Sequence, residues 1–311
     1  MEPQKIISIV VPCFNEEESL ATFNQTLIQS LPGNYQYEII YINDGSSDHT
    51  LQIILDLAKS NPAIKYISFS RNFGHQNALK AGYDFASGDC AISLDADLQH
   101  PPEVIPILIS KWEEGFEIVN TLRHDHQSIS YAKKISSGIF YQIMRKLSDV
   151  SIENGMADFR LIDKKVLKQL KLFQENFLFF RGMIPWMGFR QAIVPFKANE
   201  RFAGTTKYTF KKMVKFATTG VTAFSVKPLR ISIYLGSIIA LIAFLYGLYA
   251  VYINLFTDRA ITGWTSVIIS VLFVGGINLL MLGIIGEYLG KLFIENKRRP
   301  NYLISETNLD E

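Results

Sequence analysis

Two aspartates two positions apart, Asp95 and Asp97, follow a short apolar run that begins at Ala91. The run is typical of a buried strand, so the two carboxylates would emerge at its carboxyl end, where open α/β sheets bind their ligands. Alternate residues of an extended chain point to one side, so both side chains can face one point. Two hard oxygen donors there suit Mg²⁺ or Mn²⁺, above all an ion shared with a diphosphate. Aspartates with this spacing also occur at loop ends as solvated acids that bind no metal. The surrounding elements must decide between the two interpretations.

Strand-like runs recur through the first half of the chain, with helical patterns between the earlier ones. The predicted strands are Ile6–Pro12, Tyr37–Asn43, Ile64–Ser70, Cys90–Leu94 and Ile118–Leu122, and the predicted helices cover Glu17–Leu31, Asp48–Ser60, a segment that begins near Gly74, and Ser128–Leu147. Asn15 and the glutamates after it predict the start of the first helix. The alternation predicts an α/β fold, a mostly parallel sheet with helices on both faces. No G-x-G-x-x-G follows the first strand and no G-x-x-x-x-G-K-[ST] is present, which disfavours a Rossmann dinucleotide enzyme and a P-loop NTPase.

The C-terminal third is apolar enough to cross a membrane. No Asp, Glu, Lys or Arg occurs from Ile231 to Phe256 or from Ile261 to Gly286, and each stretch exceeds the roughly 20 residues that span a bilayer. We therefore predict transmembrane helices at 229–256 and 261–287 rather than two buried core helices. The short connector makes the pair a hairpin whose outer ends carry most of the nearby basic residues. The positive-inside rule then places the region before the hairpin and the tail 288–311 in the cytoplasm.

The remaining divisions follow from composition. Residues 1–206 form the predicted α/β domain, and 207–228 form an amphipathic juxtamembrane segment with lysines opposite its apolar face, which favours contact with lipid head groups. A net charge of +2 without a broad basic patch indicates no nucleic-acid partner. Cys13 and Cys90 lie in apolar strands and are predicted to be buried thiols rather than a disulfide or a metal site.

Five segments together resemble one family. They are Val10-Val-Pro-Cys-Phe-Asn-Glu16, Asn43-Asp-Gly-Ser-Ser-Asp48, Ser70-Arg-Asn-Phe-Gly74, Leu94-Asp-Ala-Asp-Leu-Gln99 and Ala157-Asp-Phe-Arg-Leu161. The series resembles the family 2 inverting glycosyltransferases of A-type fold (GT-A). More narrowly, it resembles the polyprenyl-phosphate glycosyltransferases, the branch of dolichyl-phosphate mannose synthase and the bacterial GtrB-like enzymes. The C-terminal hairpin matches the GtrB-like members, so the resemblance covers the whole chain.

A nucleotide-sugar site needs a pocket for the base, a charge clamp for the diphosphate and an open side for the acceptor. Pro12, Phe14 and Glu16 at one strand end, with Asp44 at the next, can hold a nucleoside through apolar contacts and hydrogen bonds. The resemblance implies that these residues form the uridine or guanosine subsite.

The resemblance also implies roles for the residues around the aspartate pair. Asp95 and its neighbour Ala96 would contact the nucleotide, and Asp95 would also reach the metal. Asp97 would be the principal ligand of Mg²⁺ or Mn²⁺ and bridge both phosphates through it. Gln99 lies close enough in sequence to contribute.

The expected acceptor, a lipid phosphate, is already deprotonated at neutral pH, so it needs cations to hold it against an anionic donor more than it needs a base. Arg123 at the end of the fifth strand is the first candidate, and Lys134 and Ser137 on the following helix come next. Arg201 matches a phosphate-binding arginine of the family. Asp158 matches an acid that relatives keep near the acceptor, and either base catalysis or orientation of a substrate fits that position.

One apolar stretch lies close to this charged site. It runs from Phe177 to Phe180 and continues with Met183, Ile184 and Trp186. A packed core explains most of such a stretch. Lining of an access route for the isoprenoid chain is the other interpretation.

The resemblance implies transfer of one sugar, with inversion, from a nucleotide diphosphate to polyprenyl phosphate at the cytoplasmic face of the inner membrane. We expect UDP-glucose as donor and undecaprenyl phosphate as acceptor, with other UDP-sugars, notably aminoarabinose derivatives, and GDP-mannose as alternatives. The Q-x-x-R-W motif of processive synthases is absent, which disfavours chain extension, and a non-catalytic membrane scaffold is the remaining alternative. Gly286-x-x-x-Gly290 permits close helix approach and leaves a homo-oligomer open.

Overall fold

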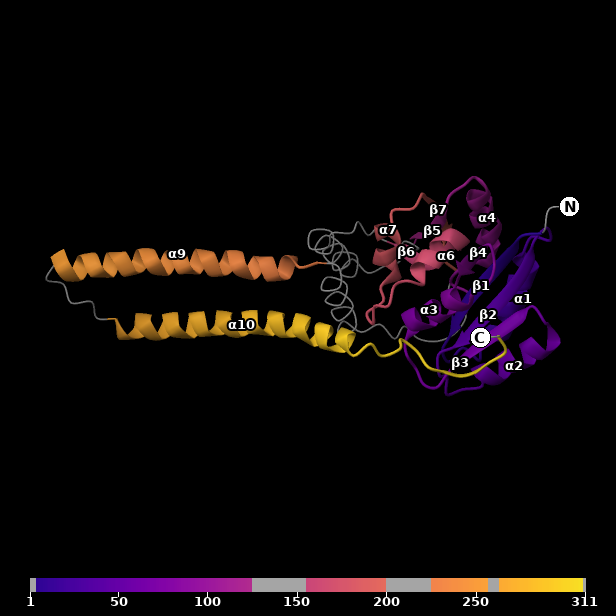
Figure 1. The fold of residues 1–311 in the computed structure, drawn as a ribbon, viewed down its shortest axis with the longest axis horizontal. Helices are drawn as coiled ribbons and strands as arrows, with labels where there is room; N and C mark the ends of the chain where they lie inside the picture. Colours follow the sequence, from indigo (N-terminus) through magenta and orange to yellow (C-terminus); the bar gives the residue numbers. More distant parts are fainter. Residues whose placement is uncertain (1–3, 125–154, 200–224, 257–262, 310–311) are drawn as a thin grey trace.

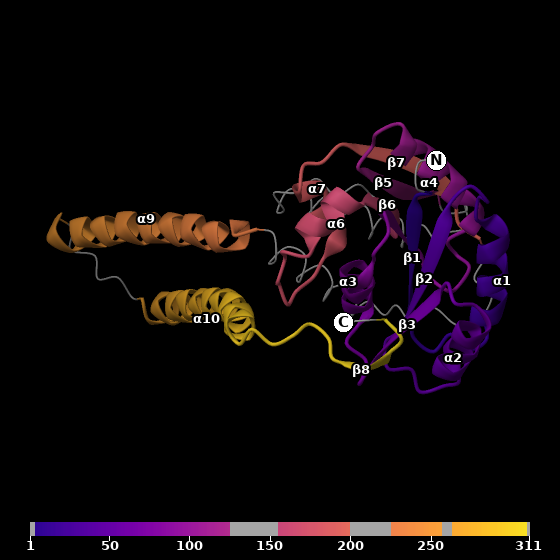
Figure 2. The ribbon, with the colours of Figure 1, turned by 45° about the vertical axis from the view of Figure 1, so that its right-hand side comes forward.

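The computed structural model describes residues 4–124, 155–199, 225–256 and 263–309. The strands are β1 Ile6–Cys13, β2 Gln36–Asn43, β3 Ile64–Phe69, β4 Cys90–Ser93, β5 Ile118–His124, β6 Met156–Asp163, β7 Gln191–Lys197 and β8 Ile304–Thr307. The helices are α1 Leu20–Ser30, α2 Thr50–Ser60, α3 His75–Phe85, the 3₁₀ turn η1 Pro102–Val104, α4 Ile105–Glu113, α6 Lys164–Leu170, α7 Phe180–Trp186, α9 Lys227–Phe256 and α10 Trp264–Asn296. Figures 1 and 2 show a rounded α/β domain from which α9 and α10 project together.

One eight-stranded sheet organises the domain, in the order β7-β5-β6-β4-β1-β2-β3-β8. The run β4-β1-β2-β3 is parallel, while β6 and β8 are antiparallel to their neighbours. The prediction of a mostly parallel GT-A-like sheet is confirmed. The parallel strands place their carboxyl ends along one edge of the sheet, where Asp95 and Asp97 are predicted to lie.

Helices cover both faces of the sheet because the central strands are apolar on both sides, as in buried parallel sheets. Ile7, Ile9 and Val11 of β1 point into a core that α1, α2 and α4 close. Val10, on the opposite face, joins the core beneath α3, α6 and α7. Cys13 and Cys90 are free, buried thiols, as predicted.

Helix α3 lies unusually close to β1 because of Gly82. A Cβ atom at Gly82 would come within 2.1 Å of Val10 Cγ1, a distance at which side chains cannot pack. The close approach fixes the amino-terminal end of α3 beside the carboxyl ends of the strands.

The predicted start of the first helix was wrong. Helix α1 begins at Leu20, and Asn15 instead has a φ of 55° and accepts a hydrogen bond from the backbone N–H of Ser47 at 2.9 Å. The side chain therefore ties the loop after β1 to the loop after β2. The Asn15 side chain could have capped the first helix locally. In the structure it accepts the hydrogen bond from the other loop instead.

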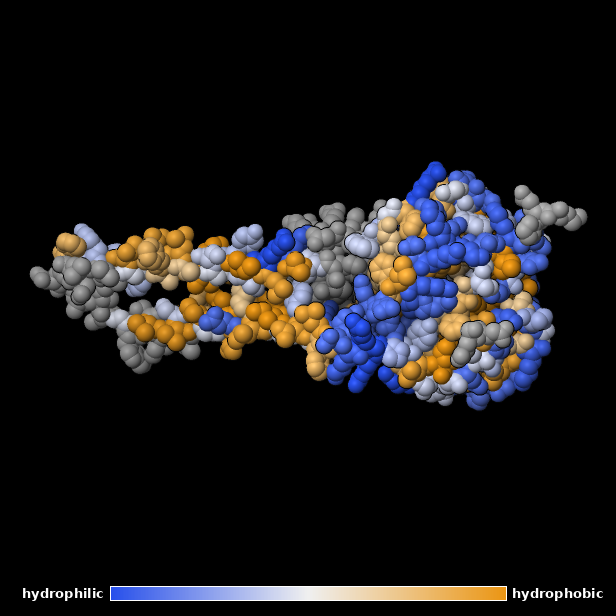
Figure 3. Space-filling view, in the orientation of Figure 1, coloured by the Kyte–Doolittle hydropathy of each residue, from blue (hydrophilic) through white to orange (hydrophobic). Residues whose placement is uncertain are grey.

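The two C-terminal helices have the length and composition of membrane spans, over Leu229–Tyr249 and Ile269–Asn296. Their apolar side chains are exposed in the isolated chain, and Figure 3 shows the projecting pair as largely hydrophobic. Helix α10 continues past Gly286, where the charge-free stretch ends, to Asn296.

The tail after α10 returns to the sheet of the α/β domain. Strand β8 pairs antiparallel with β3, and the Ser70 N–H donates to the Leu303 carbonyl at 3.0 Å. Tyr302 stacks on Phe69 with ring centroids 5.1 Å apart. Because α9 also begins on the domain side in Figures 1 and 2, both outer ends of the hairpin lie on the side of the α/β domain.

Candidate active site

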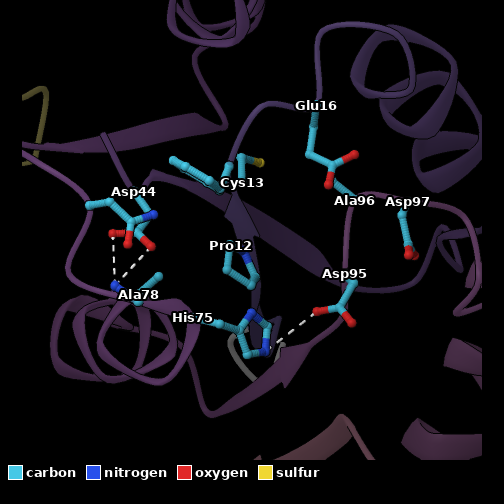
Figure 4. Close-up of a pocket in the computed structure, with 12 residues that line it drawn as sticks. Pro12, Cys13, Glu16, Asp44, His75, Ala78, Asp95, Ala96 and Asp97 are labelled. Carbon is cyan, nitrogen blue, oxygen red and sulfur yellow. Dashed lines mark hydrogen bonds and ion pairs between the residues drawn. The ribbon is translucent and has the colours of Figure 1, made fainter. Parts of the chain in front are cut away.

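A pocket of about 340 Å³ opens at the carboxyl ends of β1, β2 and β4, beside the start of α3. Its lining residues are Pro12, Cys13, Phe14, Glu16, Asp44, Asn72, Gly74, His75, Ala78, Asp95, Ala96 and Asp97. Figure 4 shows Pro12 between Asp44 on one side and His75 with Asp95 on the other. The structure thus brings together the predicted nucleoside residues and the aspartate pair, which come from strand ends far apart in sequence.

Asp44 has a second role that the sequence did not predict. Its carboxylate is 2% exposed and accepts hydrogen bonds from the backbone N–H groups of Phe73, at 2.6 Å, and Gly74, at 3.0 Å. Burial raises the pKa of Asp44, and these two N–H donors oppose the rise. The next residue, Gly45, has a φ of +63°, and a Cβ there would lie 2.3 Å from the Arg71 backbone. The end of β2 is therefore locked against the loop that leads into α3.

The aspartate pair is brought together by a turn, and the extended chain expected from the sequence was wrong. Strand β4 ends at Ser93, residues 96 and 97 form a turn, and Leu98 has a φ of 61°. Asp97 Oδ1 accepts a hydrogen bond from the Gln99 N–H at 3.0 Å, which closes the turn. Both carboxylates still line the same pocket.

His100 stabilises this turn. The Asp95 N–H donates to His100 Nδ1 at 3.0 Å, and the buried imidazole stacks on Phe159 with centroids 5.4 Å apart. The same Nδ1 lies 3.4 Å from Asp95 Oδ2. His100 therefore positions Asp95.

Asp158 lies on β6 at the centre of a charge network. Its Oδ1 is 2.8 Å from Arg160 Nη2, and its Oδ2 is 3.0 Å from Arg181 Nη2. Arg160 is completely buried and also donates to the Ala157 carbonyl at 2.9 Å. Burial alone would raise the pKa of Asp158, but Arg181, His75 and Arg160 together hold it well below its usual range. A carboxylate with so low a pKa is a weak base.

His75, the first residue of α3, lies between the two groups of carboxylates. Its Nε2 is 3.7 Å from Asp95 Oδ1 and 3.8 Å from Asp158 Oδ2, and Figure 4 draws the contact with Asp95. The His75 side chain is partly exposed, and the desolvation that lowers its pKa is outweighed by Asp95 and Asp158, which raise the pKa to about 9. The imidazolium therefore links the turn after β4 to the network on β6.

Sequence reasoning did not assign a role to His75, Arg160 or Arg181. Arg160 had a usable signal, because it follows Asp158 by two positions on one strand and so shares its face. Arg181 and His75 come from separate helices, and no local pattern connects them with Asp158.

The other predicted residues differ in how the structure places them. Arg123 Nη1 donates to Gln99 Oε1 at 3.3 Å, so the end of β5 contacts the turn that carries Asp97. Lys134, Ser137 and Arg201 lie outside the described residues.

The residues present fit a divalent cation shared with a ligand. Within the described ranges, no three His, Cys, Asp or Glu side chains are grouped as a closed metal site. Asp95 and Asp97 supply carboxylate oxygens to the pocket, and phosphate oxygens and water would supply the remaining oxygen ligands that such a cation needs.

Comparison with known proteins decides the family. The model of glycosyl transferase family 2 matches residues 8–171, more than half of the chain. This chain belongs to glycosyltransferase family 2. The model of the GtrB C-terminal hairpin matches residues 227–292 of this glycosyltransferase, which covers most of α9 and α10.

Curated relatives match this family 2 enzyme over nearly its whole length. The uncharacterized glycosyltransferase YkcC of Bacillus subtilis (strain 168) is 42% identical, covering 96% of this chain and 93% of the relative. The bactoprenol glucosyl transferase of Shigella phage SfV is also 42% identical, covering 96% and 97%.

One solved structure shows the same fold. The mannosyltransferase PcManGT from Pyrobaculum calidifontis, in complex with GDP-Man and Mn²⁺, has a TM-score of 0.50 at 16% identity. The similarity covers 71% of this chain and 64% of that one, so this chain matches less than two thirds of that structure.

Proposed function

We propose that this glycosyltransferase moves one glucose from UDP-glucose to polyprenyl phosphate, with inversion at the anomeric carbon, on the cytoplasmic face of the membrane. The main observation behind the proposal is that one chain contains both an acidic pocket and a membrane hairpin. A pocket with Asp95 and Asp97 adjoins the parallel strand ends, and a hairpin of the GtrB type follows it. Relatives at 42% identity over 96% of the chain carry the name bactoprenol glucosyl transferase.

The donor would bind with its nucleoside against Pro12, Phe14 and Glu16. Phe14 is 43% exposed at the pocket wall, which suits contact with a planar base. The diphosphate would then lie toward Asp95 and Asp97. These two carboxylates would hold Mg²⁺ or Mn²⁺, which supplies charge neutralisation for the departing diphosphate. The complex of PcManGT with GDP-Man and Mn²⁺ supports this choice of ion.

The acceptor requires no general base. An oxygen of the lipid phosphate attacks the anomeric carbon opposite the diphosphate, the bond from that carbon to the diphosphate oxygen breaks, and the nucleoside diphosphate leaves with the electron pair. The low pKa of Asp158 and its contacts with Arg160 and Arg181 favour an orienting role. Arg123, Lys134, Ser137 and Arg201 are our candidates for holding the acceptor phosphate.

The hairpin would keep the catalytic domain at the surface where the lipid acceptor lies. Both outer ends of the hairpin lie on the domain side, and Lys227, Arg230, Lys297 and Arg298 are at those ends. Basic residues flank spans on the cytoplasmic side, so we assign the domain to the cytoplasm.

Mass spectrometry of the lipid product tests the proposal. Purified full-length enzyme in lipid nanodiscs would receive undecaprenyl phosphate, Mn²⁺ and, in separate reactions, UDP-glucose, UDP-aminoarabinose derivatives and GDP-mannose. We expect a lipid carrying one hexose from UDP-glucose. A product from another donor alone would replace the assigned sugar, a polymer would indicate a chain-extending synthase, and no product with any donor would contradict the proposal.

A further inference from the structure

An exposed apolar surface on the α/β domain remains unexplained by the catalytic site. Leu172, just after α6, is 71% exposed, and Trp186, at the end of α7, is 64% exposed. Phe173 connects them, because its ring meets the Trp186 ring edge-on with centroids 5.8 Å apart. We call Leu172, Phe173 and Trp186 the Trp186 surface. The predicted core role of this stretch is confirmed for Phe180, Met183 and Ile184, which are buried, but it does not extend to Trp186.

The loop that follows Phe173 contacts the C-terminal end of the second span. The backbone N–H and the side-chain amide of Asn176 both donate to Glu295 of α10, at 3.1 Å each. Lys291 Nζ lies 5.2 Å from the centroid of the Phe177 ring. The loop that carries Phe173 therefore contacts the C-terminal end of α10, where the charged residues Lys291 and Glu295 lie. Figures 1 and 2 both show α7 on the side of the domain that faces the hairpin.

The chemistry around this surface matches a lipid interface. Lys168 and Lys171 are exposed on the same segment as Leu172. Lys297 directly follows α10, and its Nζ lies 4.1 Å from the Phe293 ring centroid. Tryptophan with flanking lysine is typical of the boundary between head groups and acyl chains. A buried core would leave neither Leu172 nor Trp186 exposed.

We propose that the Trp186 surface docks the catalytic domain onto the head-group region of an anionic phospholipid bilayer, as a membrane contact additional to the two spans and the predicted juxtamembrane segment 207–228. The proposal rests on the hairpin crossing the bilayer, as in the proposed function. A contact made by the domain itself would set the orientation of the domain on the bilayer and so the height of the pocket above the lipid phosphate.

The three tryptophans of the chain, Trp112, Trp186 and Trp264, provide a matched test. Three full-length variants would each keep one tryptophan and replace the other two by phenylalanine. Each would be reconstituted in vesicles of phosphatidylcholine and phosphatidylglycerol, with or without bromine atoms on the upper acyl carbons. Trp264 begins α10 and reports on the hairpin. Trp112, in α4 beside Lys5, reports on a part of the domain away from the hairpin (Figure 1).

We expect brominated lipid to remove about half or more of the Trp186 emission, since interfacial groups lie roughly 5–10 Å into the head-group boundary. Trp264 should be quenched as well, and Trp112 should not. Quenching of Trp264 while Trp186 behaves like Trp112 would overturn the docking proposal and leave the proposed function intact. If neither Trp264 nor Trp186 is quenched, both the docking and the membrane hairpin are wrong. Blue-shifted Trp186 emission without quenching would indicate burial against protein, such as a second copy, and also overturns the proposal.

Kinetics give a second, independent readout. The double variant Leu172→Ser, Trp186→Ser should raise the KM for undecaprenyl phosphate in vesicles several-fold and leave kcat unchanged. With a short, water-soluble prenyl phosphate its KM should equal that of the wild type. An equal rise in KM for both acceptors would contradict a docking role.

Discussion

Replacing Asp158 by asparagine tests whether this buried carboxylate is chiefly a charge partner or a catalytic base. The Asn side chain keeps the shape but removes the charge that faces Arg160 and Arg181. Arg160 is fully buried, so it would lose its ionic partner without gaining water. Breaking a buried ion pair by removing one partner costs about 3–5 kcal/mol. At roughly 2–4 °C per kcal/mol for a domain of this size, we expect the Tm to fall by roughly 6–20 °C.

The pH dependence of this loss has a definite sign. The folded state depresses the pKa of Asp158, so the carboxylate stabilises the fold above its unfolded pKa of about 4, and the benefit is lost as the pH falls through the lower folded value. The Tm difference between wild type and Asp158→Asn should therefore be constant from neutral pH down to about 5 and shrink below about 4. Thermal unfolding of the full-length protein in detergent, followed by intrinsic fluorescence, measures this difference in Tm.

Asp56→Asn is the matched control. Asp56 is an exposed carboxylate on α2 paired with Lys59 at 3.1 Å, and its loss should change stability by no more than about 0.5 kcal/mol. An Asp158→Asn protein as stable as the wild type, yet without turnover, would refute the charge-partner argument and restore the assignment of Asp158 as a base.

Three further outcomes follow from the geometry. Asp97→Asn should lower turnover by roughly 10²-fold or more, the range for loss of one electrostatic group at a transition state, with Tm unchanged; activity equal to wild type would exclude Asp97 as the metal ligand. Gly82→Ala should destabilise the domain by about 1–3 kcal/mol through overpacking, and adding Val10→Ala should recover part of the lost Tm, whereas strictly additive losses would contradict the contact. A chain ending at residue 299 loses β8, so its Tm should fall while both spans still insert; an unchanged Tm would show that β8 contributes nothing to the sheet.

Much of the architecture could be predicted because the local pattern of apolar and polar residues identifies the strands and helices. The apolar runs that became β1, β2, β3 and β4 alternate with helical patterns, and this order alone places the turn with Asp97 at the carboxyl edge. Strand β8 could not be predicted in this way. It is four residues long, its side chains are mostly exposed, and its hydrogen bonds go to β3, more than 200 positions away in sequence.

The residues of the site also differ in how far the sequence predicts them: the grouping of sequence neighbours was predictable, and contacts between distant elements were not. Asp95 and Asp97 are neighbours in sequence, so their joint presence in the pocket was predictable even though the backbone between them was not. The charges around Asp158 come from a strand, from the start of α3 and from the start of α7. Only the packing of those helices on the sheet brings His75 and Arg181 to one carboxylate.

The charges of the pocket favour a cation beside the nucleotide diphosphate of the proposed function. Among the described residues that line it, Glu16, Asp44, Asp95 and Asp97 contribute carboxylates, and His75 contributes the one basic side chain. His75 is already within 4 Å of two aspartates, so it has little positive charge to offer an incoming diphosphate. Like charges brought together out of water repel strongly, because the local dielectric is low. If a nucleotide diphosphate binds in this acidic pocket, as proposed, a divalent ion between the two would offset the repulsion, and nucleotide affinity should rise and fall with the free concentration of that ion.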